Sequence, residues 1–371
     1  MKIGYLVGRL GRGGAELQLM ILARAMAQLG HRIEVLSYDG PSPFDDDLRR
    51  SGVAVRTSAA AGRAGKVAAT RSWFEALEPD IVHGVMKRAS TLAVLARLPR
   101  RRPRIVATDM STATYGRHKP ILWASLAAFH LADRIVTQTE TNRRNLERLA
   151  PWLRGKTVVI RNGLDVQRFT PTAPVVHADC DVFRFCVAGT VYAVKNPDRV
   201  VRAVAELVRR GRSGISVDWY GRLARPYADV TAARHATLDL VDQLGVGSVI
   251  KFHGDTAAID DAYRSADALL HASVQEGFPN VVAEGMACGL PIVVSRVSDL
   301  PLVVRTANNG YVFDELDVGS IADAMERMAD TPPEERRAMG QRSRELAVRW
   351  FGLDRFANEF AALYRRLLEN R

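Results

Sequence analysis

Short apolar segments alternate with longer segments of helical periodicity, and this alternation limits the possible folds more than any other feature of the sequence. In the first half, strands are predicted at Ile3–Val7, Arg32–Ser37, Ile81–His83, Ile105–Thr108, Arg134–Gln138 and Thr157–Ile160. Helical patterns lie between them, for example at Ala15–Leu29 and Lys119–Leu131. Strands that alternate with helices favour βαβ units and a parallel sheet.

A second alternation of the same kind begins after Asp181. Its predicted strands are Phe183–Ala188, Ser216–Tyr220, Val249–His253, Ala268–Ala272 and Pro291–Ser295. Its predicted helices are Asp198–Arg210, Ala258–Ser265, Val281–Cys288 and Ile321–Ala329. The stretch from Phe169 to Asp181 contains two prolines and little periodicity, which is typical of a linker. We therefore expect two parallel-sheet domains, with ligands bound beyond the carboxyl ends of their strands, in a cleft between them.

The net charge of the chain limits the classes of partner that it is expected to bind. The formal net charge is +11, which favours nucleotide phosphates, an anionic membrane surface or nucleic acid as partners. No helix-turn-helix, zinc-finger or RNP-type signature accompanies the charge, so nucleic acid is not expected. There is no apolar run long enough for a transmembrane helix and no signal-peptide pattern, so we expect a cytoplasmic protein. The three cysteines have no metal-ligand spacing, and a reducing compartment suits them.

A glycine-rich turn follows the N-terminal strand. Gly11, Gly13 and Gly14 allow the backbone to turn sharply, and the helix after them presents free N–H groups to an anion. The spacing is not that of a dinucleotide-binding loop, because Glu16 stands where the last glycine would be. This argues against a dehydrogenase. A plain tight turn remains the alternative to a ligand contact at Gly13 and Gly14.

The segment Glu276–Pro291 carries the most information. Asn280 is suited to cap a short helix and Gly289 to end it. The N–H groups of Val281 and Val282 would then be unpaired and could bind a phosphate.

Two carboxylates bracket the start of this helix. Glu284 would lie one turn inside it, where it suits the vicinal hydroxyls of a ribose, and Glu276 precedes it, where it could accept from sugar hydroxyls. Gly277 permits close approach, and the N–H groups of Phe278 and Asn280 point toward the same space. The alternative is that Glu276 is a surface loop residue and Glu284 only complements the helix dipole. Two glutamates around one capped turn favour a binding site.

These residues resemble the retaining glycosyltransferases of family 4, whose signature is a glutamate, seven residues and a second glutamate. The whole run from Glu276 to Pro291 is similar to that signature. Further similarity to the family lies at Gly13-Gly14-Ala15-Glu16 with Gly30-His31, Arg161-Asn162-Gly163-Leu164-Asp165 with Phe169, Gly189 with Lys195-Asn196, and Asn309-Gly310-Tyr311 with Asp317.

The resemblance implies an α/β protein of GT-B fold, with two Rossmann-like parallel-sheet domains facing across a cleft. Residues 1–168, joined by a C-terminal helix at 353–371, would be the acceptor-side domain, and residues 169–352 the donor-binding domain. By resemblance, Glu276 contacts the donor sugar, Glu284 the ribose and Lys195 the diphosphate. The expected donor-binding residues are Gly13, Gly14, Gly189, Thr190, Lys195, Arg222, Gly277, Phe278, Pro279, Asn280, Val281, Val282 and Glu284.

The implied activity is transfer of a hexose, with retention, from a UDP- or GDP-sugar to a glycan or lipid-linked acceptor in cell-surface polysaccharide or glycolipid biosynthesis. Lys195 and the helix amino end would stabilise the departing diphosphate without a metal. Asp45-Asp46-Asp47 has the Asp-x-Asp spacing of metal-dependent transferases, but it follows two prolines and is interpreted as a solvated helix start. No cofactor or metal is therefore expected.

The sequence departs from the family pattern at two places. Thr190 follows Gly189 where family members usually carry an arginine, and Arg222 is the expected substitute for the missing cation. Many members also have a histidine after a strand of the first domain. Thr108–Ser111 contains none, so Asp109 is the nearest candidate catalytic residue, and a turn or cap role for it is the alternative.

A basic amphipathic region suggests contact with an anionic membrane, which would suit a lipid-linked acceptor. Its cations are Arg97, Arg100, Arg101, Arg102 and Arg104. Its apolar face is predicted to contain Ile121, Leu122, Trp123, Leu126, Phe129 and His130. A solvated loop beside a core-facing helix is the alternative.

Two other functions remain. One is a non-catalytic nucleotide-sugar-binding protein, suggested by Thr190 and the missing histidine. The other is a nucleotide-sugar 2-epimerase. Enzymes of that class share the overall fold, but they lack the combination of motifs found in this sequence.

Overall fold

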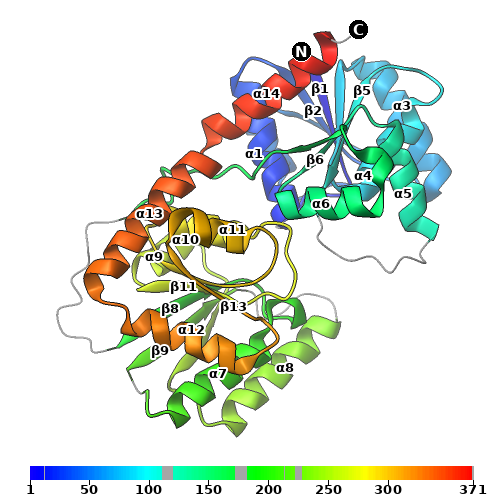
Figure 1. The fold of residues 1–371 in the computed structure, drawn as a ribbon. Helices are drawn as coiled ribbons and strands as arrows, with labels where there is room; N and C mark the ends of the chain where they lie inside the picture. The colour runs from blue at the N-terminus through cyan, green and yellow to red at the C-terminus, as the bar shows by residue number, and fades with distance from the viewer. Residues whose placement is uncertain (12, 111–119, 172–181, 213, 222–227, 370–371) are drawn as a thin grey trace. The chain divides into compact units, whose positions relative to one another are not determined.

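A computed structural model describes residues 1–11, 13–110, 120–171, 182–212, 214–221 and 228–369 (Figure 1). The chain divides into two compact units: Met1–Leu164 with Phe351–Arg371, and Asp165–Trp350. The domain boundaries predicted from the sequence lie within a few residues of this division.

Unit 1 is built on a seven-stranded parallel sheet with the strand order β3-β2-β1-β4-β5-β6-β7. The strands are β1 (Lys2–Val7), β2 (Arg32–Ser37), β3 (Ala54–Thr57), β4 (Ile81–Gly84), β5 (Arg104–Asp109), β6 (Arg134–Thr137) and β7 (Thr157–Val159). The helices are α1 (Gly14–Gln28), α2 (Asp45–Arg50), α3 (Gly62–Leu77), α4 (Met86–Arg97), α5 (Pro120–Leu131), α6 (Glu140–Leu149), the 3-10 turn η1 (Pro151–Leu153) and α14 (Leu353–Glu369).

Two apolar layers enclose the sheet of unit 1. On one face α1 and α14 pack together over β1 (Figure 1). Tyr364 of α14 is fully buried there, and its hydroxyl donates to that of Tyr5 at 3.4 Å. On the other face α3, α4 and α5 bury Trp73, Leu126 and Phe129. The edge strand β3 escaped prediction because its side chains are mostly exposed and form no apolar run.

Unit 2 is built on a six-stranded parallel sheet with the order β10-β9-β8-β11-β12-β13. The strands are β8 (Phe183–Ala188), β9 (Ile215–Tyr220), β10 (Ile250–Gly254), β11 (Ala268–His271), β12 (Ile292–Ser295) and β13 (Gly310–Phe313). The helices are the 3-10 turn η2 (Ala193–Lys195), α7 (Pro197–Arg209), α8 (Ala228–Gln243), α9 (Ile259–Arg264), α10 (Asn280–Ala287), α11 (Leu300–Ala307), α12 (Val318–Asp330) and α13 (Pro333–Phe351).

Both sheets have doubly wound order, in which the strand sequence reverses next to the first strand of the unit. The reversal lies between β1 and β4 in unit 1 and between β8 and β11 in unit 2. Ligands of such sheets bind at the carboxyl ends of the strands at this switch point. The loops after β8 and β11 are therefore where a ligand of unit 2 is expected.

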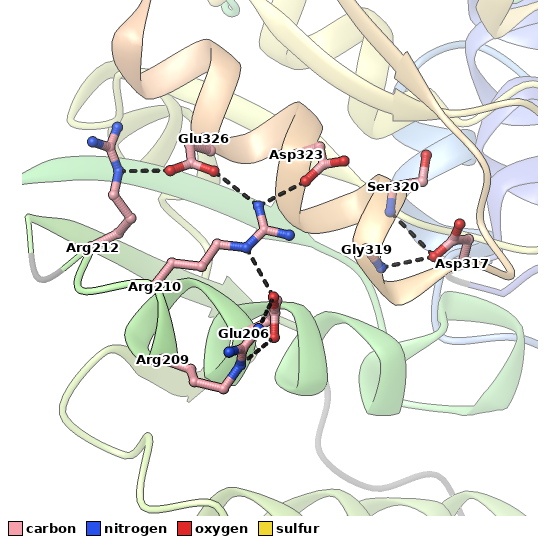
Figure 2. A network of polar contacts seen from close by, with 9 residues as sticks. All are labelled: Glu206, Arg209, Arg210, Arg212, Asp317, Gly319, Ser320, Asp323 and Glu326. Carbon is pink, nitrogen blue, oxygen red and sulfur yellow. Dashed lines mark hydrogen bonds and ion pairs between the residues drawn. The ribbon is translucent and has the colours of Figure 1, made fainter.

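A polar network fixes α7, the helix that follows the β8 loop, against α12. Arg210 donates to Glu206 at 2.9 Å, to Asp323 at 2.7 Å and to Glu326 at 2.9 Å (Figure 2). Asp317 caps α12 by accepting from the N–H groups of Gly319 and Ser320. These contacts join the end of α7 to α12.

Candidate functional site

The loops after β8 and β11 meet at the switch point of unit 2. The N–H of Val274, after β11, donates to the carbonyl of Val194, after β8, at 2.9 Å. This contact sets two side chains side by side: Lys195 Nζ lies 2.5 Å from Glu276 Oε1, and both side chains are only about one-sixth exposed. The structure therefore unites the two residues that the sequence assigned to the diphosphate and the donor sugar.

Glycines bring the loops after β8 and β9 into close contact. Gly189 directly follows β8, and a Cβ there would lie 3.3 Å from the Lys195 side chain. Gly221, which follows β9, has φ +153°, and a Cβ there would lie 2.0 Å from the carbonyl oxygen of Gly189. Only glycine fits at position 221. Thr190 follows Gly189 and is half-buried, whereas Arg222 lies outside the described residues.

His271, the last residue of β11, was not predicted from the sequence as a site residue. Its side chain is 2% exposed, and its Nε2 lies 3.4 Å from Glu276 Oε1. A polar residue that ends an otherwise apolar strand, directly before the motif loop, is the signal that could have revealed it.

His271 and Lys195 affect the charge state of Glu276, and Glu276 affects that of His271. Burial alone would raise the pKa of Glu276, but the His271 ring and the charge of Lys195 hold it well below its usual range. Burial lowers the pKa of His271, an effect that its contact with Glu276 only partly offsets. At neutral pH the group is therefore a carboxylate beside an ammonium and a neutral imidazole.

Helix α10 begins one residue earlier than the sequence suggested. Pro279 occupies the N-cap position in an extended conformation and makes no side-chain cap hydrogen bond. The prediction that Asn280 caps it is wrong, because Asn280 is already its first helical residue. The N–H of Val282 is not free either, since it donates to the carbonyl of Pro279 at 3.1 Å. Of the two N–H groups predicted to bind a phosphate, only that of Val281 has no acceptor among the described residues.

Packing fixes the turn that leads into this helix. Phe278 is buried, and the Ser298 hydroxyl donates to the carbonyl of Gly277. At the other end, Gly289 adopts φ +83° and ends the helix as predicted.

Glu284 lies one turn inside α10 and is half-buried. Its Oε2 accepts a hydrogen bond of 2.9 Å from the hydroxyl of Tyr263, a fully buried residue of α9. Burial raises the pKa of Glu284, opposed by this hydrogen bond and by the charge of Arg168. Its Oε1 has no hydrogen-bond partner in the part of the chain that the structure describes, so it can accept from a ligand hydroxyl.

The remaining predicted site residues belong to unit 1. Gly13 is the N-cap of α1 and Gly14 its first residue, and the Glu16 carboxylate folds over Gly13. Asp109 ends β5, is 4% exposed and lies 3.2 Å from Lys87 Nζ. The structure thus places Asp109 in a buried ion pair, and a catalytic role for it stays a prediction.

A buried histidine does lie beside this position. Nε2 of His83 forms a hydrogen bond with the hydroxyl of Thr108, the residue before Asp109, and its Nδ1 lies 2.7 Å from the Tyr364 hydroxyl. Burial lowers its pKa to about 3. His83 is thus a neutral histidine held between α14 and β5, and it belongs to β4 and not to the stretch Thr108–Ser111 where a family histidine was sought.

These features define a class: two doubly wound units, one with a lysine–glutamate pair and a short helix at its switch point. Solved structures of this class share the fold. The complex of Anabaena HepE with UDP has a TM-score of 0.85 at 18% identity, covering 99% of this chain and 100% of that one. Sucrose-phosphate synthase from Thermosynechococcus elongatus has a TM-score of 0.85 at 19% identity, with 100% of both chains covered. The predicted GT-B fold class is confirmed.

Two family models match the chain. Residues 177–346 match the family described as glycosyl transferases group 1, and residues 12–168 match the one described as glycosyltransferase family 4. The chain belongs to family 4 of the glycosyltransferases, as its motifs indicated.

Curated relatives are similar over part of their length. The D-inositol 3-phosphate glycosyltransferase of Saccharomonospora viridis is 32% identical over 249 residues, which cover 64% of this chain and 56% of that protein. The protein of the same name from Kineococcus radiotolerans is 31% identical over 264 residues, or 65% of this chain and 58% of that protein. The match thus spans a little more than half of these relatives.

Proposed function

We propose that the protein transfers a hexose from a UDP- or GDP-sugar to a glycan or lipid-linked acceptor, with retention and without a metal ion. The observation that carries the proposal is the Lys195–Glu276 pair at the switch point of unit 2, beside α10. The similarity to HepE, which has been solved with UDP and with UDP-glucose, favours a uridine nucleotide.

In this proposal the donor replaces an internal ion pair. The diphosphate takes Lys195 as its counter-charge, and the released Glu276 accepts hydrogen bonds from the hydroxyls of the donor sugar. Oε1 of Glu284 accepts from the ribose while Tyr263 holds Oε2. Each group exchanges one partner for another, so no charge is left unpaired.

Bond cleavage builds negative charge on the departing diphosphate. Lys195 and the N–H of Val281 are the donors placed to stabilise it. Among the described residues no group of three or more His, Cys, Asp or Glu side chains is arranged to hold a metal. The Asp45–Asp47 run forms the first turn of α2, where Asp46 and Asp47 pair with arginines. Full activity in the presence of a chelator would support metal independence, and restoration by Mg²⁺ or Mn²⁺ after its loss would refute it.

The acceptor is expected to bind at the carboxyl edge of the sheet in unit 1. Arg88 is exposed at the start of α4, directly after β4 at the switch point, next to Lys87, which pairs with Asp109. The cation at Arg88, together with the names of the curated relatives, favours an acceptor that carries a phosphate, such as a phosphorylated polyol or a lipid-linked phosphate. A comparison of phosphorylated and unphosphorylated acceptors in the transfer assay tests this choice.

The apolar face of α5 that was predicted to contact a membrane does not face solvent as a whole, so a membrane contact would involve other side chains. Leu122, Leu126 and Phe129 are buried in the core of unit 1 and cannot reach a bilayer. Trp123 of α5 is instead 42% exposed and stacks on Trp152 of η1, which is 47% exposed.

This aromatic pair has suitable neighbours for a membrane. Leu131 is exposed at the end of α5, and Arg148 and Arg154 are exposed on the adjoining elements. Aromatic side chains with flanking cations suit the surface of an anionic membrane. Among the described residues no helix is long and apolar enough to cross a bilayer. Sedimentation with anionic vesicles at low salt tests the contact, and equal sedimentation of the W123A/W152A variant would reject it.

A thermal-shift panel of nucleotides and nucleotide sugars tests the function itself. A ligand that binds only the folded state raises the melting temperature. We expect a shift with a UDP- or GDP-sugar and transfer or slow hydrolysis of the same donor. A shift without turnover would instead indicate a non-catalytic binding protein, and formation of the 2-epimer would indicate an epimerase. No shift with any member of the panel would reject all three.

A further inference from the structure

One carboxylate oxygen at the switch point faces two nitrogen atoms. Glu276 Oε1 lies 2.5 Å from Lys195 Nζ and 3.4 Å from His271 Nε2. The second distance exceeds that of an ordinary hydrogen bond. Nε2 of His271 is buried, and in the described part of the chain no atom forms a hydrogen bond to it. The imidazole is therefore close to the carboxylate without being fully engaged by it.

The two nitrogen-bearing side chains differ in mobility. His271 is the last residue of β11 and is 2% exposed, and its backbone pairs with Val294 of β12. Its ring cannot follow a ligand. Lys195 ends a short 3-10 turn and carries its ammonium on a flexible four-carbon stem. Of the two, only Lys195 can turn toward an incoming diphosphate.

Departure of Lys195 would remove a positive charge from beside Glu276. A largely buried carboxylate is less favourable without that charge, and a nearby phosphate would repel it. A small movement of the carboxylate toward His271 would complete a hydrogen bond from Nε2–H. Because the imidazole is neutral, it does not compete with Lys195 for the phosphate.

We infer that His271 is a positioning residue, which holds the Glu276 carboxylate in place for the donor sugar once Lys195 has turned to the diphosphate. This role rests on the proposed function. It predicts that His271 matters for the sugar moiety of the donor and not for its nucleotide.

Three substitutions at one position test this role. H271L removes the donor and keeps a bulky buried side chain. H271Q places an amide N–H near the position of Nε2, and H271N is also polar but its amide ends near the position of Nδ1. For each variant, dissociation constants are measured for UDP and for UDP-glucose, or for GDP and GDP-mannose if the wild type prefers guanine. The turnover number and melting temperature are measured alongside.

We expect H271L and H271N to bind the nucleotide sugar about tenfold or more weakly, the loss usual for a hydrogen bond to a charged group. Affinity for the bare nucleotide should stay within about twofold, and H271Q should recover most of the loss. An unchanged ratio of the two affinities in H271L, or equal loss of both ligands in all variants, would overturn the inference. If H271L does not fold, the comparison of H271Q with H271N decides. Failure of the proposed function would appear separately, as a wild-type protein that binds neither ligand.

Discussion

Lys195 and Glu276 are 81 residues apart in the chain, and their side chains meet at 2.5 Å beside the switch point of the second sheet. Each is the counter-charge of the other while no donor is bound. A site of this kind is assembled in advance, because the cation needed by a diphosphate and the carboxylate needed by a sugar are both already held in place.

Loss of either partner should impair turnover more than folding. We expect K195A and E276Q to lower kcat by about 10²–10³, the range typical for removal of a group that stabilises developing charge. Steady-state kinetics with the preferred nucleotide sugar measures the effect. K251A removes an exposed lysine of β10 in the same unit and should leave kcat unchanged. Equal activity of K195A and K251A would contradict the assignment of Lys195.

The two motif glutamates should affect stability with opposite signs. The pKa of Glu276 is held below its usual range, so its ionisation stabilises the folded state above the usual glutamate pKa, and this contribution is lost as the pH falls. The pKa of Glu284 is raised by burial, so its ionisation destabilises the folded state at neutral pH.

At pH 7 we therefore expect E276Q to lower the free energy of unfolding by about 1–3 kcal/mol, because Lys195 loses its partner. E284Q should raise it by about 1 kcal/mol, as changes at functional sites often do. The Glu284 difference should shrink as the pH falls through its raised pKa toward that of the unfolded chain, and the Glu276 difference should shrink only below the pKa of the unfolded chain. Denaturant unfolding at pH 7 and pH 4 tests this, and the same sign for both variants would disprove it.

Tyr263 should set the pH range in which the nucleotide binds. Its hydrogen bond lowers the pKa of Glu284 against the effect of burial. Removing it in Y263F should raise that pKa further. As the pH is lowered, Glu284 should therefore become protonated, and affinity for UDP should be lost, at a higher pH than in the wild type. Dissociation constants measured between pH 4 and pH 8 show the midpoint of this loss. Y311F removes another tyrosine hydroxyl of unit 2, which contacts Thr331, and should not move the midpoint.

Gly221 should tolerate no side chain. A Cβ there would lie 2.0 Å from the carbonyl oxygen of Gly189, so G221A must separate the loops after β8 and β9. We expect a loss of at least about 3 kcal/mol in the free energy of unfolding. Gly211 also has positive φ, but a Cβ there meets nothing within 4 Å, and G211A should cost only about 1 kcal/mol. Similar losses in both variants would show that conformation, and not contact, governs position 221.

Local patterns were sufficient for most of the fold. Buried strands such as β8 are apolar runs, interrupted there only by Arg184, and a run of this kind is visible without knowledge of its neighbours. The edge strand β3 is partly solvated and lacks that pattern. The amphipathic segment at α5 was visible too, but its periodicity did not show that Leu126 and Phe129 face the core and leave Trp123 exposed.

The sequence by itself determined the two sets of alternating strands and helices, the family and the glutamates of the motif, because these follow from residue type and short-range spacing. Only the tertiary structure decided that β8 lies beside β11. That pairing joins segments far apart in the chain, and local periodicity carries no information about it. It brings Lys195 beside Glu276, whereas His271 and Glu276 are already close in the chain, on β11 and the loop after it.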